Sequence, residues 1–181
     1  MNAERENYIV LLLGSAEGPI PTVWHLQKEM FLLSRAIPKV QGLFNFEKHY
    51  EGPYCQALQE QSKEPFYLAD AYGFDNAGRL HLTMDGRKIF SAIIKQYQSN
   101  ERFMRMFNSM KLIRSIYDKL QKDELLLLVY VSYPEFIDLS NAYDRLVKDA
   151  EKRGGLAKGL LEKGVITQDR YKEIVNLKVV E

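Results

Sequence analysis

Hydrophobic residues recur at helical spacing along most of the chain, which predicts a mainly helical protein. An apolar run over residues 8–13 ends at Gly14, and it predicts a first, largely buried helix over residues 3–13. Residues 22–37 place apolar side chains three and four positions apart. They predict a second helix that ends before Pro38, because proline interrupts helical hydrogen bonding.

The next apolar residues alternate with polar ones instead of following a helical period. Residues 43–50 show this period of two, which predicts a short, half-buried strand. Gly52 and Pro53 end that strand. Because proline suits the first position of a helix, residues 54–62 are predicted to form a short third helix.

A β-hairpin is predicted after this third helix. Residues 66–74 and 79–83 have strand-like patterns, and the polar residues 75–78 between them suit a turn. Thr83 is then positioned to cap a fourth helix that runs through Tyr97.

A long helix with an apolar stripe is predicted over residues 101–121. This stripe has two interpretations that the sequence leaves open. It can pair with a second copy of the chain in a homodimer, or it can pack inside its own subunit. The candidate dimer or partner contacts on it are Phe103, Phe107, Met110 and Tyr117.

The remaining residues also have helical patterns. A nearly all-apolar helix is predicted to begin at the cap Asp123, and a further helix at the cap Ser140. Gly154 and Gly155 are predicted to stop the second of these. Two short helices over residues 156–163 and 168–177 complete the chain, the last one capped by Thr167.

The predicted fold is therefore mostly α with a small antiparallel β-hairpin. The first part of the chain reads helix, helix, strand, helix, strand, strand, helix, which is the order expected of a winged helix-turn-helix domain over residues 1–98. A C-terminal helical domain is predicted over residues 101–181.

Composition places the chain among ordinary soluble globular proteins. Of its 181 residues 46% are hydrophobic, and 25 basic residues against 24 acidic ones give a formal net charge of +1. The lone Cys55 forms no internal disulfide, which suits a reducing compartment. The most apolar window, residues 125–131, is much shorter than the roughly 20 residues of a membrane helix. Because the N-terminus is also unlike a signal peptide, we expect a cytoplasmic protein without membrane association.

Two turn motifs carry a resemblance to a known group of proteins. One motif precedes the third helix and the other ends the hairpin; they consist of Tyr50, Glu51, Gly52, Pro53 and Tyr54, and of Leu82, Thr83 and Gly86. Over residues 5–98 the chain resembles uncharacterised prokaryotic winged-helix proteins that are similar to the antitoxin-associated Panacea domain. The resemblance implies a binding or regulatory module more than an enzyme.

DNA binding with a role in transcription regulation is the leading expectation for such a domain. The third helix would enter the major groove, where glutamine side chains read base edges, and the hairpin would contact the DNA backbone. The candidate nucleic-acid-binding residues are Lys48, Tyr54, Gln56, Gln59, Gln61, Lys63, Arg79 and His81.

The charge of this first half favours an alternative. Residues 1–100 carry ten basic against eleven acidic residues, a net charge of −1, whereas DNA affinity rests largely on an excess of Lys and Arg. The alternative is an antitoxin-like or scaffolding module, in which the same helix and wing contact a protein. Its aromatic contact surface would consist of Tyr54, Phe66, Tyr67 and Tyr72.

The sequence offers little support for catalysis. No two of His25, His49 and His81 have the spacing of helical metal ligands, and no glycine-rich phosphate loop is present. Cys55 and His49 are six positions apart and are the one candidate nucleophile pair, but no further residue completes a catalytic signature. We therefore expect a non-enzymatic protein without metal or cofactor.

Overall fold

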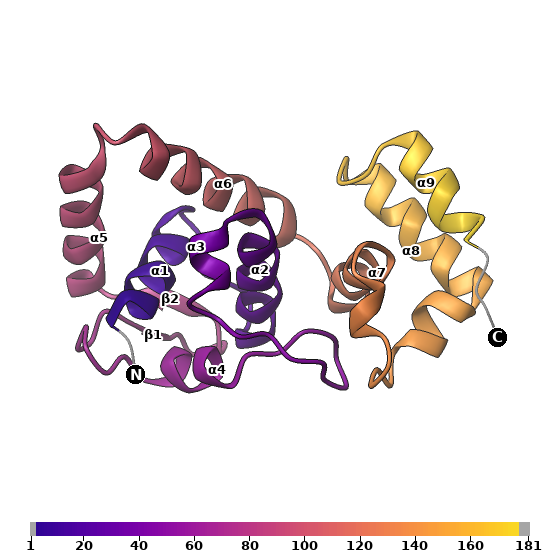
Figure 1. The fold of residues 1–181 in the computed structure, drawn as a ribbon, viewed down its shortest axis with the longest axis horizontal. Helices are drawn as coiled ribbons and strands as arrows, with labels where there is room; N and C mark the ends of the chain where they lie inside the picture. The colour runs from indigo at the N-terminus through magenta and orange to yellow at the C-terminus, as the bar shows by residue number, and fades with distance from the viewer. Residues whose placement is uncertain (1–2, 178–181) are drawn as a thin grey trace. The chain divides into compact units, whose positions relative to one another are not determined.

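The computed structural model describes residues 3–177, which form a mostly helical chain with one two-stranded antiparallel sheet (Figure 1). The chain divides into two compact units. The first comprises Met1–Phe46 and Cys55–Lys119, and the second comprises Glu47–Tyr54 and Leu120–Glu181. The chain thus enters the second unit at residue 47, returns before the third predicted helix, and leaves the first unit again after residue 119.

The helices and the hairpin of the first unit follow the predicted order, with one additional short helix. They are α1 (Ala3–Gly14), α2 (Val23–Ala36), α3 (Pro38–Gln41), α4 (Gln56–Lys63), β1 (Tyr72–Phe74), β2 (Leu80–Leu82), α5 (Met84–Tyr97) and α6 (Glu101–Tyr117). The predicted cap Thr83 is confirmed, and Thr22, which was not predicted as a cap, begins α2 in the same way. The Thr22 hydroxyl accepts the His25 amide at the start of α2, and the Thr83 hydroxyl accepts the Gly86 amide at the start of α5.

Gly86 shows why the turn from the hairpin into α5 requires glycine. A Cβ atom at this position would lie 1.7 Å from the carbonyl oxygen of Ala71, a residue that precedes β1. The backbones of α5 and of the hairpin entry therefore approach as closely as they can without a side chain between them. This contact fixes the first turn of α5 against the sheet.

The strand predicted over residues 43–50 is wrong. Within that segment only Glu47 makes a β-bridge, to Tyr54. The period of two arises because Phe44 is buried and Phe46 packs edge-on against Phe31 of α2, both from irregular backbone. A different residue, Ile20 between α1 and α2, forms a β-bridge to the hairpin. Its backbone amide and carbonyl pair with those of Leu80 in β2 through two hydrogen bonds of 2.9 Å each.

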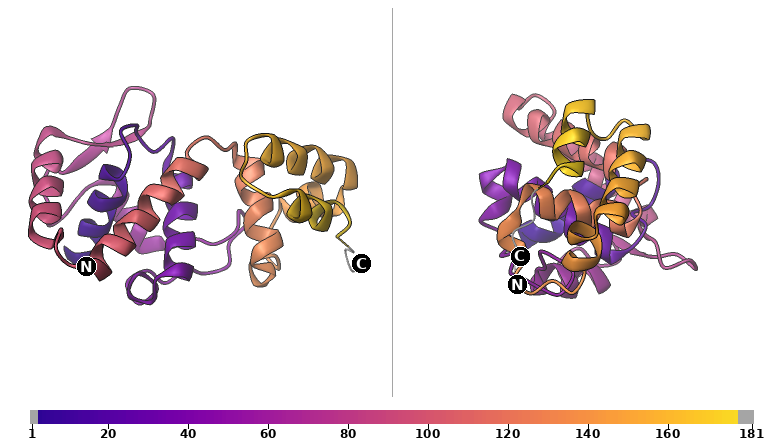
Figure 2. Two further views of the ribbon diagram at one scale, coloured as in Figure 1. Left: turned by 90° about the horizontal axis from the view of Figure 1, so that it is seen from above. Right: turned by 90° about the vertical axis from the view of Figure 1, so that its right-hand side faces the viewer.

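The core of the first unit surrounds α1, whose residues 8–13 are all buried. This helix contacts α4, α5, α6 and β2 (Figures 1 and 2). Because α6 packs on both α1 and α2, the domain boundary predicted between residues 98 and 101 moves to residue 119.

The apolar stripe of α6 packs against this same core. Phe107 and Met110 are buried within the unit, while Phe103 and Tyr117 are half-buried against it. At Phe107 and Met110 the stripe therefore packs inside its own subunit. These two buried side chains offer no surface for contact with a second copy of the chain. Burial of these residues does not require a dimer.

The second unit consists of helices and the excursion over Glu47–Tyr54. Its elements are α7 (Lys122–Ser132), a 3₁₀ turn (Pro134–Phe136), a short π-helix (Asp144–Lys148), α8 (Ala150–Glu162) and α9 (Gln168–Val175). No helix formed by residues 3–177 is long and apolar enough to span a bilayer.

Several predicted boundaries in this unit are corrected. Helix α7 begins one residue before Asp123, which instead binds Arg145. The Ser140 hydroxyl accepts two amides of a local turn and begins no long helix. Gly154 lies inside α8 because the Asp149 carboxylate caps that helix five residues earlier, accepting the Lys152 amide. Gly155, also inside α8, does not stop it either.

Candidate interaction surface

The predicted nucleic-acid-binding residues are divided between the two units. Lys48 and Tyr54 belong to the second unit, where Lys48 is ion-paired with Asp138 and the Tyr54 ring stacks on His49 at 4.8 Å. The other candidates belong to α4 and the hairpin of the first unit. Lys48 thus carries an acidic partner within its own unit.

The candidates on α4 are presented unequally. Gln56 is exposed, and its amide donates to the Glu60 carboxylate at 2.7 Å. Gln59 is half-buried and Gln61 is buried, so Gln61 cannot read a base edge, contrary to the prediction. Lys63 is exposed at the end of the helix. The exposed side of α4 therefore combines acidic and basic groups.

The hairpin candidates are held by contacts within the hairpin. The Arg79 guanidinium pairs with Asp75 at 2.7 Å, and a ring nitrogen of His81 lies 2.9 Å from the Gly73 carbonyl oxygen. The Arg79 backbone amide and guanidinium hold the pKa of the Asp75 carboxyl below its ordinary value. A cleft of about 230 Å³ lies beside these residues and is also lined by Arg87.

A side-chain amide on α2 fixes the start of α4. Gln27 is buried, its Nε2 donates to the Cys55 carbonyl, and its Oε1 accepts the Cys55 amide, both at 2.9 Å. Cys55 is the N-cap residue of α4 and its side chain is buried, so the thiol is not presented to a substrate. The Cys55–His49 pair therefore gains no support as a nucleophile.

A buried carboxylate fixes the turn that follows α4. Glu6 of α1 is fully buried, and its two oxygens accept the backbone amides of Phe66, Tyr67 and Leu68, each at 2.8 Å. The side chains of the first two point outward: Phe66 is 64% exposed and Tyr67 is 45% exposed, with ring centroids 4.9 Å apart. Ordered backbone thus carries an exposed pair of aromatic rings.

A cleft of about 700 Å³ is lined by Phe66 of this aromatic pair. It is lined by Arg5 of α1, by the α4 residues Ala57, Glu60 and Gln61, and by residues 64–66 of the turn. Its volume lies within the range of about 300–1,000 Å³ that is typical of ligand pockets. Of the aromatic surface predicted for a protein contact, Phe66 and Tyr67 are exposed here, whereas Tyr72 is buried. The sequence did not indicate the role of Glu6, because it stands 60 positions before Phe66.

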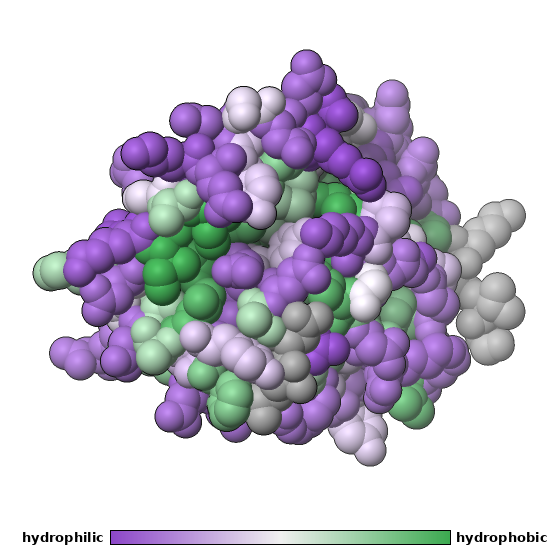
Figure 3. Space-filling model, turned by 60° about the vertical axis from the view of Figure 1, so that its left-hand side comes forward, coloured by the Kyte–Doolittle hydropathy of each residue, from purple (hydrophilic) through white to green (hydrophobic). Residues whose placement is uncertain are grey.

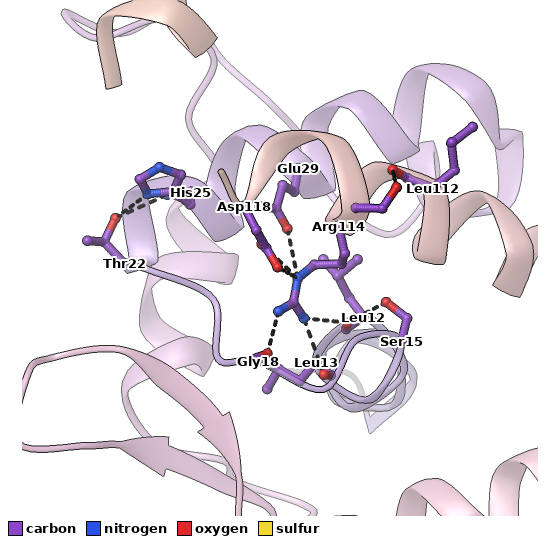
Figure 4. A network of polar contacts seen from close by, with 11 residues as sticks. Leu12, Leu13, Ser15, Gly18, Thr22, His25, Glu29, Leu112, Arg114 and Asp118 are labelled. Carbon is purple, nitrogen blue, oxygen red and sulfur yellow. Dashed lines mark hydrogen bonds and ion pairs between the residues drawn. The ribbon is translucent and has the colours of Figure 1, made fainter. Parts of the chain in front are cut away.

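Arg114 of α6 is the centre of the polar network drawn in Figure 4. Its fully buried guanidinium donates to both Asp118 oxygens at 2.8 Å and to the Leu12 and Gly18 carbonyls at 2.9 and 2.6 Å. Glu29 of α2 lies 3.7 Å from the same guanidinium. Burial, together with the nearby Asp118, raises the pKa of Glu29 well above its ordinary value. The network fastens α6 to α1 and α2.

The surface of the molecule also shows apolar side chains among hydrophilic ones (Figure 3). The α5 residues Ile89, Ile93 and Ile94 are half-buried against the core.

Among the residues 3–177 no three histidine, cysteine or acidic side chains form a group suited to a metal ion. The chain matches no family model, no curated protein and no solved structure.

Proposed function

We propose that the first unit is a non-enzymatic module of the winged-helix type that binds a protein partner. The order α1, Ile20 bridge, α2, α4, β1 and β2 supports this class, since a winged helix pairs a short segment after its first helix with the hairpin. We call the binding region the α4–turn surface; it comprises Gln56, Glu60, Lys63, Glu64, Phe66 and Tyr67.

The ordered aromatic pair is the observation that carries the proposal. Exposing Phe66 to water gives up the free energy that burial of an aromatic ring provides, about 1.5–3 kcal/mol. Glu6 nevertheless holds the backbone that carries Phe66 and Tyr67 in one conformation. A turn whose backbone is already fixed loses little backbone entropy on binding, and exposed aromatic side chains are typical of protein interaction sites.

Charge favours protein over DNA as the partner. Two acidic residues, Glu60 and Glu64, lie on the exposed part of α4 and its end, where they would repel phosphates. Of the cations predicted to contact DNA, Arg79 is paired with Asp75 and Lys48 with Asp138. Breaking such a pair to bind a phosphate returns less free energy than binding with an unpaired cation.

Site-specific photocrosslinking tests this proposal in the full chain. A photoreactive phenylalanine analogue is placed at Phe66, and as a matched control at Leu112 of α6, which is 59% exposed. We expect a discrete crosslinked protein band in cells from position 66 and none from position 112. Equal patterns from both positions, or no crosslink at position 66, would contradict protein binding by the α4–turn surface.

DNA binding is the second candidate, favoured by the exposed position of Lys63 on α4. It is tested by fluorescence anisotropy with duplex DNA at low salt. Binding that weakens steeply with salt and is reduced by Lys63→Glu would establish this function. Our primary proposal predicts no saturable binding in that assay.

A further inference from the structure

We infer that the cleft beside Phe66 receives a partner segment that carries an arginine or lysine next to an apolar residue. This inference rests on the proposed function and names the chemistry of the partner. Three features of the cleft support it: its aromatic wall, its acidic residues and its ordered backbone.

The aromatic wall suits a cationic side chain. The ring of Phe66 lines the cleft, and the ring of the neighbouring Tyr67 lies edge to face with it at an interplanar angle of 75°. Arginine and lysine are attracted to the face of an aromatic ring, and arginine more often makes this contact. The apolar residues Ala57 and Pro65, which also line the cleft, provide a place for the neighbouring aliphatic side chain.

The acidic residues give the cleft the complementary charge. Glu60 and Glu64 are four positions apart at the end of α4, and both line the cleft. Arg5 is the basic residue in the lining, so the lining carries a net charge of −1, and the Arg5 Nε is already bound to the Leu43 carbonyl at 2.6 Å. A carboxylate beside an aromatic ring binds a guanidinium more strongly than either group alone.

The backbone of the turn is already in place for such a contact. All three successive amides from Phe66 to Leu68 donate to Glu6, so the backbone that carries Phe66 does not have to order when the partner arrives. The main entropic cost of binding is then the ordering of the partner segment itself. This predicts binding of short segments and not only of folded domains.

Synthetic peptides test the inference with the full chain. Three twelve-residue probes of equal length combine leucine with arginine, with glutamate or with serine, and each carries a fluorophore for anisotropy. We expect saturable binding of the arginine–leucine probe and at least about tenfold weaker binding of the other two. The double variant Glu60→Lys, Glu64→Lys should weaken the arginine–leucine probe by at least about tenfold.

A matched control separates this effect from net charge. Asp85→Lys, Glu101→Lys changes two exposed acids of the same unit by the same total charge, and should leave binding nearly unchanged. If both double variants weaken binding equally, the interaction is non-specific attraction and the inference fails. Phe66→Ala provides the second readout, with an expected loss of at least about tenfold.

The outcomes distinguish the inference from the proposed function. If the glutamate–leucine or serine–leucine probe binds best and Phe66→Ala abolishes that binding, the protein-binding function stands and the basic partner is wrong. If no probe binds and position 66 gives no crosslink, both fail. If no probe binds but position 66 does crosslink to a protein, the inference alone is contradicted.

Discussion

The segments that precede and follow α4 are held by opposite means. Before the helix, the chain over Glu47–Tyr54 is held in the second unit by the exposed ion pairs Lys48–Asp138 and Glu51–Lys122. After the helix, the turn is held in the first unit by the fully buried Glu6.

The two kinds of contact differ in how much they stabilise the backbone on either side of α4. An exposed ion pair contributes about 0–1 kcal/mol and is screened by salt, because water competes for both charges. A buried acceptor with three amide donors contributes more, since removing it leaves three donors without an acceptor. The turn after α4 is therefore held firmly, as is the Cys55 cap that Gln27 binds, whereas the side chains of residues 47–54 hold that segment only weakly.

The largest expected effect is that of Glu6→Ala. The variant leaves the three amides from Phe66 to Leu68 without their acceptor, which we expect to cost about 3 kcal/mol or more of unfolding free energy. Urea unfolding followed by circular dichroism measures it. Glu17→Ala, which removes an exposed acid, is the control and should change the value by less than about 0.5 kcal/mol. A loss below about 1 kcal/mol for Glu6→Ala would contradict the comparison.

Gln27→Leu tests the buried contact at the beginning of α4. The variant removes the acceptor of the Cys55 amide and a donor to its carbonyl, with an expected cost of about 1–2 kcal/mol. The same urea experiment measures it, with the exposed Gln98→Leu as control. Equal stabilities of the two variants would show that Gln27 does not fix this end of the helix.

Glu29→Gln asks whether every buried carboxylate behaves as Glu6 does. Because the pKa of Glu29 is raised in the folded chain above 4.5, the folded state holds its proton more tightly than the unfolded state. The protonated Glu29 side chain thereby contributes to the unfolding free energy. This contribution is complete below pH 4.5 and is lost as the pH rises through the pKa of Glu29 in the folded state.

We therefore expect the wild-type unfolding free energy to fall relative to Glu29→Gln as the pH rises above that value. The slope of the difference is at most about 1.4 kcal/mol per pH unit. Urea titrations of both proteins over this pH range give the slope. A difference that does not change with pH would show that Glu29 is ionised beside Arg114.

The smallest effects are expected at the exposed pairs before α4. Glu51→Ala and Lys48→Ala should each change the unfolding free energy by less than about 1 kcal/mol. The change should diminish further in about 1 M salt. Thermal unfolding at low and high salt checks this. A large effect that persists in salt would show that these ion pairs hold the segment before α4 firmly, which would contradict the comparison with the turn after α4.

Local signals in the sequence predicted the elements, and distant contacts decided the surface. Thr83 and Thr167 were predicted correctly as helix caps, because a cap binds an amide only three residues away. The helix end predicted at Gly154 is wrong, because glycine is tolerated inside a helix whose start is capped elsewhere.

The functional candidates were harder to predict for the same reason. Lys48 suggested a phosphate contact, but its acidic partner Asp138 lies 90 positions away. The acid that pairs with Arg79, Asp75, lies only four positions before it, and this local pair was not predicted. Glu6 and Gln27 gave no signal at all, because each binds backbone atoms at least 28 positions away. The exposed aromatic residues were visible in the sequence; the carboxylate that orders them was not.

Amide hydrogen exchange of the free full chain tests the central claim, that Glu6 orders the aromatic turn before any partner binds. The amides of Phe66, Tyr67 and Leu68 are followed by NMR in the wild type and in Glu6→Gln. We predict exchange at least about 100-fold slower than the intrinsic rate in the wild type, corresponding to an opening free energy of about 2.7 kcal/mol, and much of this protection lost in the variant. Exchange near the intrinsic rate in the wild type, or equal protection in both proteins, would contradict the account.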